Sequence, residues 1–393
     1  MNFATMQLDN NQKVFFELVR AGLWDKTPVH DSWFLVHGSE RVDWDKVYQS
    51  AAEQSVQGLV LAGIEKAITN CTDNTNRPPQ VQLLQWIGEV QIIEQQNRAM
   101  NDFVAKLIDK LREADVYAIL VKGQGIAQCY ERPLWRASGD VDLLLNDSNY
   151  EKAKTTLLPL ALEVDTEYKS LKHLGMTMKE GFVVELHGMQ HSRLSKRVDK
   201  GIDDAQHDVF CGGNVRSWDN KGTQVFLPSP DNDVIFIFTH ILKHFYIEGI
   251  GLRQICDWCR LLWTYKDSLI HELLEKRIRN MGLMTEWKAF AAFAVEYLGM
   301  PVEAMPLFKE SDNHKLHKKA DRIMEFVMET GNFGHNREMK WSEYFIVGKM
   351  QAALFKMGDF ARHARLFPKD SVKFYCHYLV DGIRQAYAKK TSK

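Results

Sequence analysis

The amino-acid sequence predicts an α+β protein in which a small mixed or antiparallel sheet is flanked by N-terminal and C-terminal helical regions. Apolar residues recur at helical spacing through residues 1–113 and again from residue 229 onward. Between these regions, short runs of strand length are separated by glycine-containing turns. These observations divide the chain into an N-terminal helical region (1–113), an α/β core (114–228) and a C-terminal helical region (229–393).

The composition narrows the class of protein. The chain has 393 residues, enough for two or three domains or one enlarged core, and 45 % of them are hydrophobic and 26 % charged. A net charge of −1 gives no overall attraction to nucleic acid or to an anionic membrane. The net charge does not exclude a local basic groove. The six cysteines are scattered, and no apolar run has signal-peptide or membrane-spanning length. We therefore expect a cytoplasmic protein that does not bind membranes.

The N-terminal region reads as a helical scaffold. Apolar stripes at helical spacing predict helices over Gln12–Leu23 and Gly58–Ile68, and Asp43 is the expected N-cap of another. The asparagine-rich stretch Cys71–Pro79 is expected to be a loop. After it, Val81–Glu113 is predicted to form one long helix whose later part packs on the sheet.

Two carboxylates dominate the central part of the chain. Asp140 and Asp142 alternate with Val141 and precede three leucines, which is typical of a short strand. Side chains on a strand alternate between its faces, so both aspartates are expected to point the same way. Two neighbouring carboxylates repel each other unless a cation lies between them, and such oxygen ligands suit Mg²⁺ or Mn²⁺. The alternative is a pair of solvent-exposed acids on an antiparallel sheet.

A second strand is expected to add a third carboxylate. The stretch Gly181–Gly188 places Glu185 and His187 on one face, and a tight turn joins it to an expected strand over Leu174–Lys179. If this strand pairs with the acidic strand, Glu185 joins the two aspartates. The basic residues before the hairpin, which include His173, either approach bound phosphates or form a solvated loop.

A glycine-containing turn precedes the acidic strand. An expected strand over Val116–Val121 leads into Lys122, Gly123 and Gly125 and then into a short helix. Glycines let the backbone approach a ligand closely, and a helix N-terminus presents free N–H groups to phosphate. Lys122 adds a positive charge, and Arg136 either clamps phosphates or lies on the surface.

Together these motifs resemble a known superfamily. The pattern comprises Val121-Lys122-Gly123, Tyr130, Arg136, Ser138-Gly139-Asp140-Val141-Asp142-Leu143-Leu144-Leu145 and Val184-Glu185-Leu186-His187. It resembles the nucleotidyltransferase superfamily typified by DNA polymerase β, and most closely a bacterial branch of uncharacterised nucleotidyltransferases. It is also similar to abortive-infection toxins. The sequence departs from the familiar members because Lys122–Gly125 stands where they carry a Gly-Ser turn, and Gly188 replaces an aromatic residue.

The resemblance implies a Mg²⁺-dependent transfer of the NMP group from an NTP, such as ATP, to a hydroxyl acceptor. Two Mg²⁺ or Mn²⁺ ions would be bound by the catalytic carboxylates Asp140, Asp142 and Glu185. The resemblance does not identify the acceptor, which could carry its hydroxyl on a protein, on a small molecule or sugar, or on an RNA end. The alternatives are a non-catalytic nucleotide sensor and an RNA-modifying toxin of a toxin–antitoxin pair. The residues implied to bind the nucleotide are Lys122, Gly123, Gly125, Arg136, Ser138 and Gly139.

The C-terminal region offers further candidates on helices. A helix is expected to begin at Ser229-Pro230, and it places His240 and His244 on one face. A zinc site is the weaker reading of this pair, because no third ligand lies nearby in the sequence. Helix packing or contact with substrate is favoured instead, and His187 and His240 are candidates for the acceptor side.

The next expected helix carries a pair of charged residues and a pair of cysteines, and the sequence allows more than one role for each pair. Arg253 and Asp257 either brace the acceptor side of the cleft or form an intrahelical ion pair. Cys256 and Cys259 lack the strand–helix context of a redox motif and are expected to be buried thiols.

Overall fold

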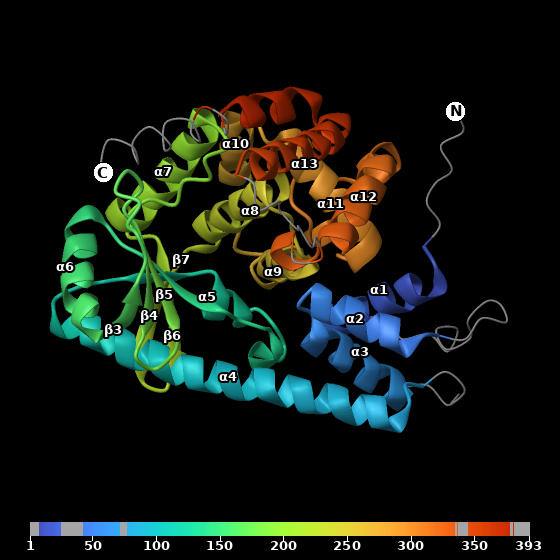
Figure 1. Ribbon diagram of the computed structural model, residues 1–393, viewed down its shortest axis with the longest axis horizontal. Coiled ribbons are helices and arrows are strands. Elements are labelled where there is room, and N and C mark those ends of the chain that lie inside the picture. The colour runs from blue at the N-terminus through green and yellow to red at the C-terminus, as the bar shows by residue number, and fades with distance from the viewer. Residues whose placement is uncertain are drawn as a thin grey trace.

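The computed structural model describes residues 8–24, 42–70, 77–334, 336, 345–377 and 380. Its centre is a seven-stranded sheet with the order β3-β4-β5-β2-β1-β7-β6. The pairs β2–β5 and β1–β7 are parallel and the other pairs antiparallel, so the sheet is mixed. Helices flank it, which confirms the α+β class (Figure 1). The strands are β1 (Ile119–Val121), β2 (Asp140–Leu144), β3 (Ala161–Val164), β4 (His173–Met178), β5 (Val183–His187), β6 (Val215–Asn220) and β7 (Thr223–Pro228).

Most helices lie before or after the sheet in the sequence. Asp9 and Asp43 cap the first two helices through side chains that accept backbone N–H groups, as expected for Asp43. The helices are α1 (Asn10–Leu23), α2 (Trp44–Glu53), α3 (Gln57–Asn70), α4 (Gln80–Glu113), α5 (Gly123–Ala127), α6 (Asp147–Leu157), α7 (Lys196–Cys211), α8 (Pro230–Ile247), α9 (Leu252–Thr264), α10 (His271–Met281), α11 (Met284–Leu298), α12 (Glu310–Thr330) and α13 (Phe345–Leu366).

One face of the sheet is buried against helices α4 and α6. The long helix α4 runs along the sheet and continues to α2 and α3, as Figure 1 shows. Its later turns supply the apolar side chains that the sequence predicted for this contact. The strand residues on this face are Leu120, Val141, Leu143, Leu174, Met176, Met178, Val184, Leu186, Val225 and Leu227. Because strand side chains alternate, the carboxylates of β2 and β5 must point to the opposite face.

A second core joins the two helical regions of the chain. It includes buried side chains of α1–α3 together with those of α8, α9, α11 and α12. The contact is also polar, since Arg20 Nε donates to the Tyr297 carbonyl at 3.0 Å and Trp24 Nε1 donates to the Leu298 carbonyl at 2.7 Å. Helices from both ends of the sequence therefore share one hydrophobic core, which lies beside the sheet face that carries the carboxylates.

The structure differs from the expected elements in several places. The strand expected over Val116–Val121 is only Ile119–Val121, because its pairing with β2 begins at Ile119, opposite Leu144. Helix α7 and the β6–β7 hairpin were not predicted. Residues 71–76 of the expected asparagine-rich loop lie outside the described residues, and the proposed domain boundaries stay predictions.

Among the described helices, none combines the length and the hydropathy that crossing a membrane requires.

Candidate active site

The three predicted carboxylates converge on the open face of the sheet. In the parallel pair β2–β5, Asp142 lies directly opposite Glu185, which places both side chains on one face. Asp140, Asp142 and Glu185 each offer a ligand atom, and these atoms lie within 4.8 Å of one another. They line a cleft of about 470 Å³ between the sheet and helices α8 and α9. The strand pairing that the sequence suggested is therefore present.

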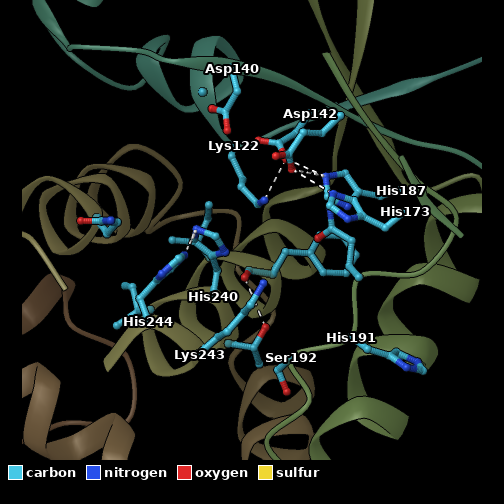
Figure 2. Close-up of a pocket in the computed structure, with 18 of the residues that line it drawn as sticks. Lys122, Asp140, Asp142, His173, His187, His191, Ser192, His240, Lys243 and His244 are labelled. Atoms are coloured by element: carbon cyan, nitrogen blue, oxygen red, sulfur yellow. Dashed lines mark hydrogen bonds and ion pairs between the residues drawn. The ribbon is translucent and has the colours of Figure 1, made fainter. Parts of the chain in front are cut away.

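The turn before the cleft brings a lysine to the carboxylates. Lys122 has φ 59° and Gly123 has φ 38°, so the chain leaves β1 through two residues in the sparsely populated positive-φ region. The Lys122 Nζ atom lies 2.9 Å from Asp142 Oδ1, and Figure 2 shows the lysine side chain directed at Asp142. Burial alone would lower the pKa of Lys122, but the carboxylates, led by Asp142, raise it. The lysine is therefore a fixed positive charge within the acidic site.

The two aspartates are in different electrostatic environments. Burial would raise the pKa of Asp142, but Lys122 and the hydrogen-bonded His187 outweigh burial and lower it. The Asp142 carboxylate is thus ionised and already neutralised by neighbours. For Asp140, the adjacent Asp142 charge, followed by burial, raises the pKa. Repulsion between the carboxylates is therefore concentrated on Asp140.

Two histidines adjoin Glu185. His187 Nε2 lies 2.7 Å from Asp142 Oδ1 and 3.3 Å from Glu185 Oε2, and His173 Nε2 lies 3.2 Å from the same Glu185 atom. Hydrogen bonds from His173 and His187 hold the pKa of Glu185 far below its ordinary value. His173, left open between phosphate contact and a solvated loop, is part of the site because the β4–β5 hairpin pairs it with His187.

Arg136 does not extend freely into the cleft. It forms a bidentate ion pair with Asp257 of α9, with Nη2 to Oδ2 at 2.6 Å and Nε to Oδ1 at 3.1 Å. The Tyr130 hydroxyl donates to the same Asp257 carboxylate at 2.7 Å. Arg253 Nη1 donates to the Ala137 carbonyl at 2.7 Å, and Arg136 Nη1 donates to Ser138 Oγ at 3.0 Å. This buried network holds the segment that leads into β2.

Helix α8 forms the wall opposite the carboxylates. His240, Lys243 and His244 line the cleft, and Figure 2 shows them across the site from Asp140 and Asp142. Burial, reinforced by Lys122, holds the pKa of His240 well below its ordinary value, so its imidazole is neutral. Burial and Lys122 also lower the pKa of Lys243. The cleft is therefore polarised, with carboxylates on the sheet and basic groups on α8.

The paired histidines of α8 do not form a three-ligand metal site with other described residues. His240 Nε2 and His244 Nε2 lie 3.0 Å apart, and His244 Nδ1 lies 2.8 Å from Glu248. Neither histidine belongs to any group of three potential ligands found in the described part of the chain. The preference for packing or substrate contact stays a prediction.

The predicted glycines have different surroundings. Gly123 and Gly139 line the cleft, and a Cβ on Gly139 would meet no atom within 4 Å. A Cβ on Gly125 would lie 2.8 Å from Leu227 Cδ2, so Gly125 allows the short helix α5 to approach β7 closely. A side chain at position 125 would thus clash with β7, whereas the space around Gly139 beside the carboxylates is open.

The cysteine pair of α9 is away from this chemistry. Cys256 and Cys259 are buried free thiols. Burial raises the pKa of both thiols, which makes them poor nucleophiles and poor redox groups. The expectation of buried thiols is therefore confirmed.

Comparison with known proteins gives a family match. A family model described as an uncharacterised nucleotidyltransferase matches residues 40–299. No curated protein matches the chain. Among solved structures, the crystal structure of an antigenic nucleotidyltransferase-like protein from Paracoccidioides brasiliensis is similar at 16 % identity with a TM-score of 0.29. That match covers 46 % of this chain and 86 % of the other, and at this level it supports no inference about function.

Proposed function

This chain belongs to the family of uncharacterised nucleotidyltransferases, and from that membership we propose a metal-dependent transfer of the NMP group of an NTP to a hydroxyl acceptor. The observation that best supports the proposal is the convergence of Asp140, Asp142 and Glu185 within 4.8 Å of one another beside Lys122. We further propose kinship with the DNA polymerase β-like superfamily, on the acidic-strand motif.

The carboxylates fit divalent cations in charge and in ligand type. They are hard oxygen donors, and the raised pKa of Asp140 reflects negative charge that Lys122 does not neutralise. Asp140, Asp142 and Glu185 would hold Mg²⁺ or Mn²⁺, with two ions proposed. When bound, the ions neutralise triphosphate charge and lower the pKa of the attacking hydroxyl.

The side chains of the cleft would promote the reaction by their charges and by holding the reacting groups in position. Lys122 and Lys243 lie on two sides of the cleft and attract the phosphate oxygens. The acceptor oxygen forms a bond to the α-phosphorus, the bond from that phosphorus to the bridging oxygen of the β-phosphate breaks, and pyrophosphate leaves. Glu185 would be the third metal ligand, and the proton of the acceptor hydroxyl passes to water, because hydrogen bonds from His173 and His187 lower the pKa of Glu185 and make it a weak base. Arg136, bound by Asp257, acts by positioning the strand that carries the aspartates.

Two labelled substrates test this reaction. Each common NTP, labelled separately at the α-phosphate and the γ-phosphate, is incubated with Mg²⁺, the protein and cell extract that contains protein, RNA and small molecules. We expect α-label on an acceptor and γ-label in pyrophosphate, and both are expected to be lost in Asp140→Asn. Transfer of the γ-label would contradict the proposal. Binding of NTP and metal without any transfer would favour a sensor, and label confined to RNA would favour the toxin alternative.

A further inference from the structure

A group of nitrogen and oxygen ligands lies beside the three carboxylates. His173, Glu185 and His187 each offer one ligand atom, and these atoms lie within 4.8 Å of one another. His173 begins β4, and His187 ends β5 directly opposite it. Glu185 belongs to both this group and the carboxylate group, so the two groups are adjacent and share one ligand.

The geometry of this group is held by backbone contacts on both sides of His173. The Tyr168 N–H donates to the His173 carbonyl at 2.9 Å, and the Gly188 N–H donates to the Lys172 carbonyl at 2.7 Å. The imidazole rings of His173 and His187 are stacked with centroids 4.7 Å apart and planes 23° apart. Both rings therefore present Nε2 to the same side, toward Glu185.

The distances match those between ligands that share one ion. His173 Nε2 and His187 Nε2 lie 3.2 and 3.3 Å from Glu185 Oε2. Ligands with bonds of about 2.1 Å are separated by about 3.0 Å at right angles and by about 3.4 Å at the tetrahedral angle. The observed separations fall between these two values. Each imidazole can thus share one ion with Glu185, and the ligand atoms of the two imidazoles lie within 4.8 Å of each other.

We propose that His173, His187 and Glu185 form a transition-metal site next to the site of Asp140, Asp142 and Glu185. Imidazole nitrogen suits Zn²⁺, Co²⁺ and Ni²⁺, whereas Mg²⁺ strongly prefers oxygen ligands and water. The cleft then has a cation site with nitrogen ligands beside the carboxylate site that is proposed for Mg²⁺ or Mn²⁺. This inference rests on the proposed function only for the role of the neighbouring carboxylate site, because metal binding by the histidines needs no transfer reaction.

The alternative is that the two histidines only donate hydrogen bonds to the carboxylates. The 2.7 Å contact between His187 Nε2 and Asp142 Oδ1 has the length of such a bond. A glutamine in place of His173 separates the two readings. Its side-chain amide can donate a hydrogen bond to Glu185, but it is a poor ligand for Zn²⁺ or Co²⁺.

Titration of the EDTA-treated, full-length protein with Co²⁺ tests the site, because the visible absorption of Co²⁺ reports its ligands and geometry. Calorimetry compares the affinities for Zn²⁺ and Mg²⁺. We expect Zn²⁺ to bind at least about tenfold more tightly than Mg²⁺. His173→Ala and His173→Gln should both weaken Zn²⁺ binding by about 10-fold to 100-fold and reduce the Co²⁺ absorption. His191→Ala is the matched control, since His191 lines the same cleft but pairs with Asp203.

Two results would overturn the site. Equal affinity of the wild type for Zn²⁺ and Mg²⁺ would exclude imidazole ligation, and unchanged Zn²⁺ binding in His173→Gln would show that the histidine only donates a hydrogen bond. Circular dichroism of each variant establishes that the fold is retained. Asp140→Asn separates this inference from the proposed function, because Asp140 lies outside the histidine group. We expect Asp140→Asn to lose transfer and keep the Co²⁺ spectrum.

Discussion

Neutralising each aspartate of β2 in turn should change stability in opposite directions. Asp140→Asn and Asp142→Asn remove the same charge from the same strand with almost no change of shape, so each is the control for the other. Asp142 is 2 % exposed and pairs with Lys122 Nζ at 2.9 Å, whereas Asp140 is the carboxyl whose pKa is raised by its neighbour. Asp142→Asn removes the buried counter-charge of Lys122 and should destabilise the fold. Asp140→Asn relieves repulsion between carboxylates and should stabilise it.

The expected magnitudes follow from these contacts. Removing one partner of a buried ion pair costs about 3–5 kcal/mol, and the 18 % exposure of the Lys122 side chain reduces this for Asp142→Asn to about 2–4 kcal/mol. Carboxylates at most 4.8 Å apart repel by about 3.5 kcal/mol at an effective permittivity of 20. Lys122 cancels much of that repulsion, so Asp140→Asn should gain about 1 kcal/mol at pH 7.

Urea unfolding in EDTA measures both effects. Because the pKa of Asp140 is raised in the folded state, its penalty is present above that pKa and is lost as the pH falls toward about 4. The gain in Asp140→Asn should therefore disappear at acidic pH. Equal stability of the two variants at pH 7 would refute the assignment of Lys122 to Asp142. Loss of stability in Asp140→Asn would show that this carboxylate has a structural partner.

Three further predictions concern other positions. Lys243→Ala should weaken NTP binding about tenfold in calorimetry without lowering the melting temperature, because it removes a half-buried cation of the cleft wall. Unchanged affinity would place the phosphates elsewhere. Arg136→Lys should cost about 2–4 kcal/mol in urea unfolding, since lysine cannot replace the bidentate pair with Asp257; full stability would contradict a structural role for the pair. Burial, then the nearby Asp370, raises the pKa of Glu286 to about 8. Its folded pKa is above the ordinary value of about 4.3, so wild-type stability should fall as the pH rises from about 5 to 8, and Glu286→Gln should flatten that decline in melting temperature. An unchanged slope would show that Glu286 does not titrate in this range.

Local patterns in the sequence were sufficient for the elements that carry the carboxylates. The alternation around Asp140 and Asp142 predicted β2, and the Lys179-Glu180-Gly181 turn predicted the hairpin that ends with Glu185. The long helix α4 was predicted from its apolar stripe to within one residue at its start. These features depend on side-chain periodicity and on turn residues, both of which are readable in a short window.

Of the features that were not predicted, helix α7 has a local signal, whereas strand β6 and the ion pair of Arg136 have an obscured signal or none. Strand β6 has alternating residues, but charged and polar side chains at Arg216, Asp219 and Asn220 obscure it. Helix α7 has an amphipathic pattern and a Ser195 N-cap, so the signal for this helix is present in the local sequence. The pairing of Arg136 with Asp257 joins residues 121 positions apart, and no local pattern reports such a contact.

The contact between Arg136 and Asp257, which are far apart in the sequence, also holds the site together. Asp257 of α9 receives Arg136 and Tyr130 from the segment between α5 and β2, so a helix of the C-terminal region fixes the approach to the acidic strand. The apolar face of that strand is independently buried against α4 and α6. The strand is therefore held on one face by packing and at its start by a buried ion pair. Its other face can then carry mutually repelling carboxylates at a cost of about 1 kcal/mol without losing its position.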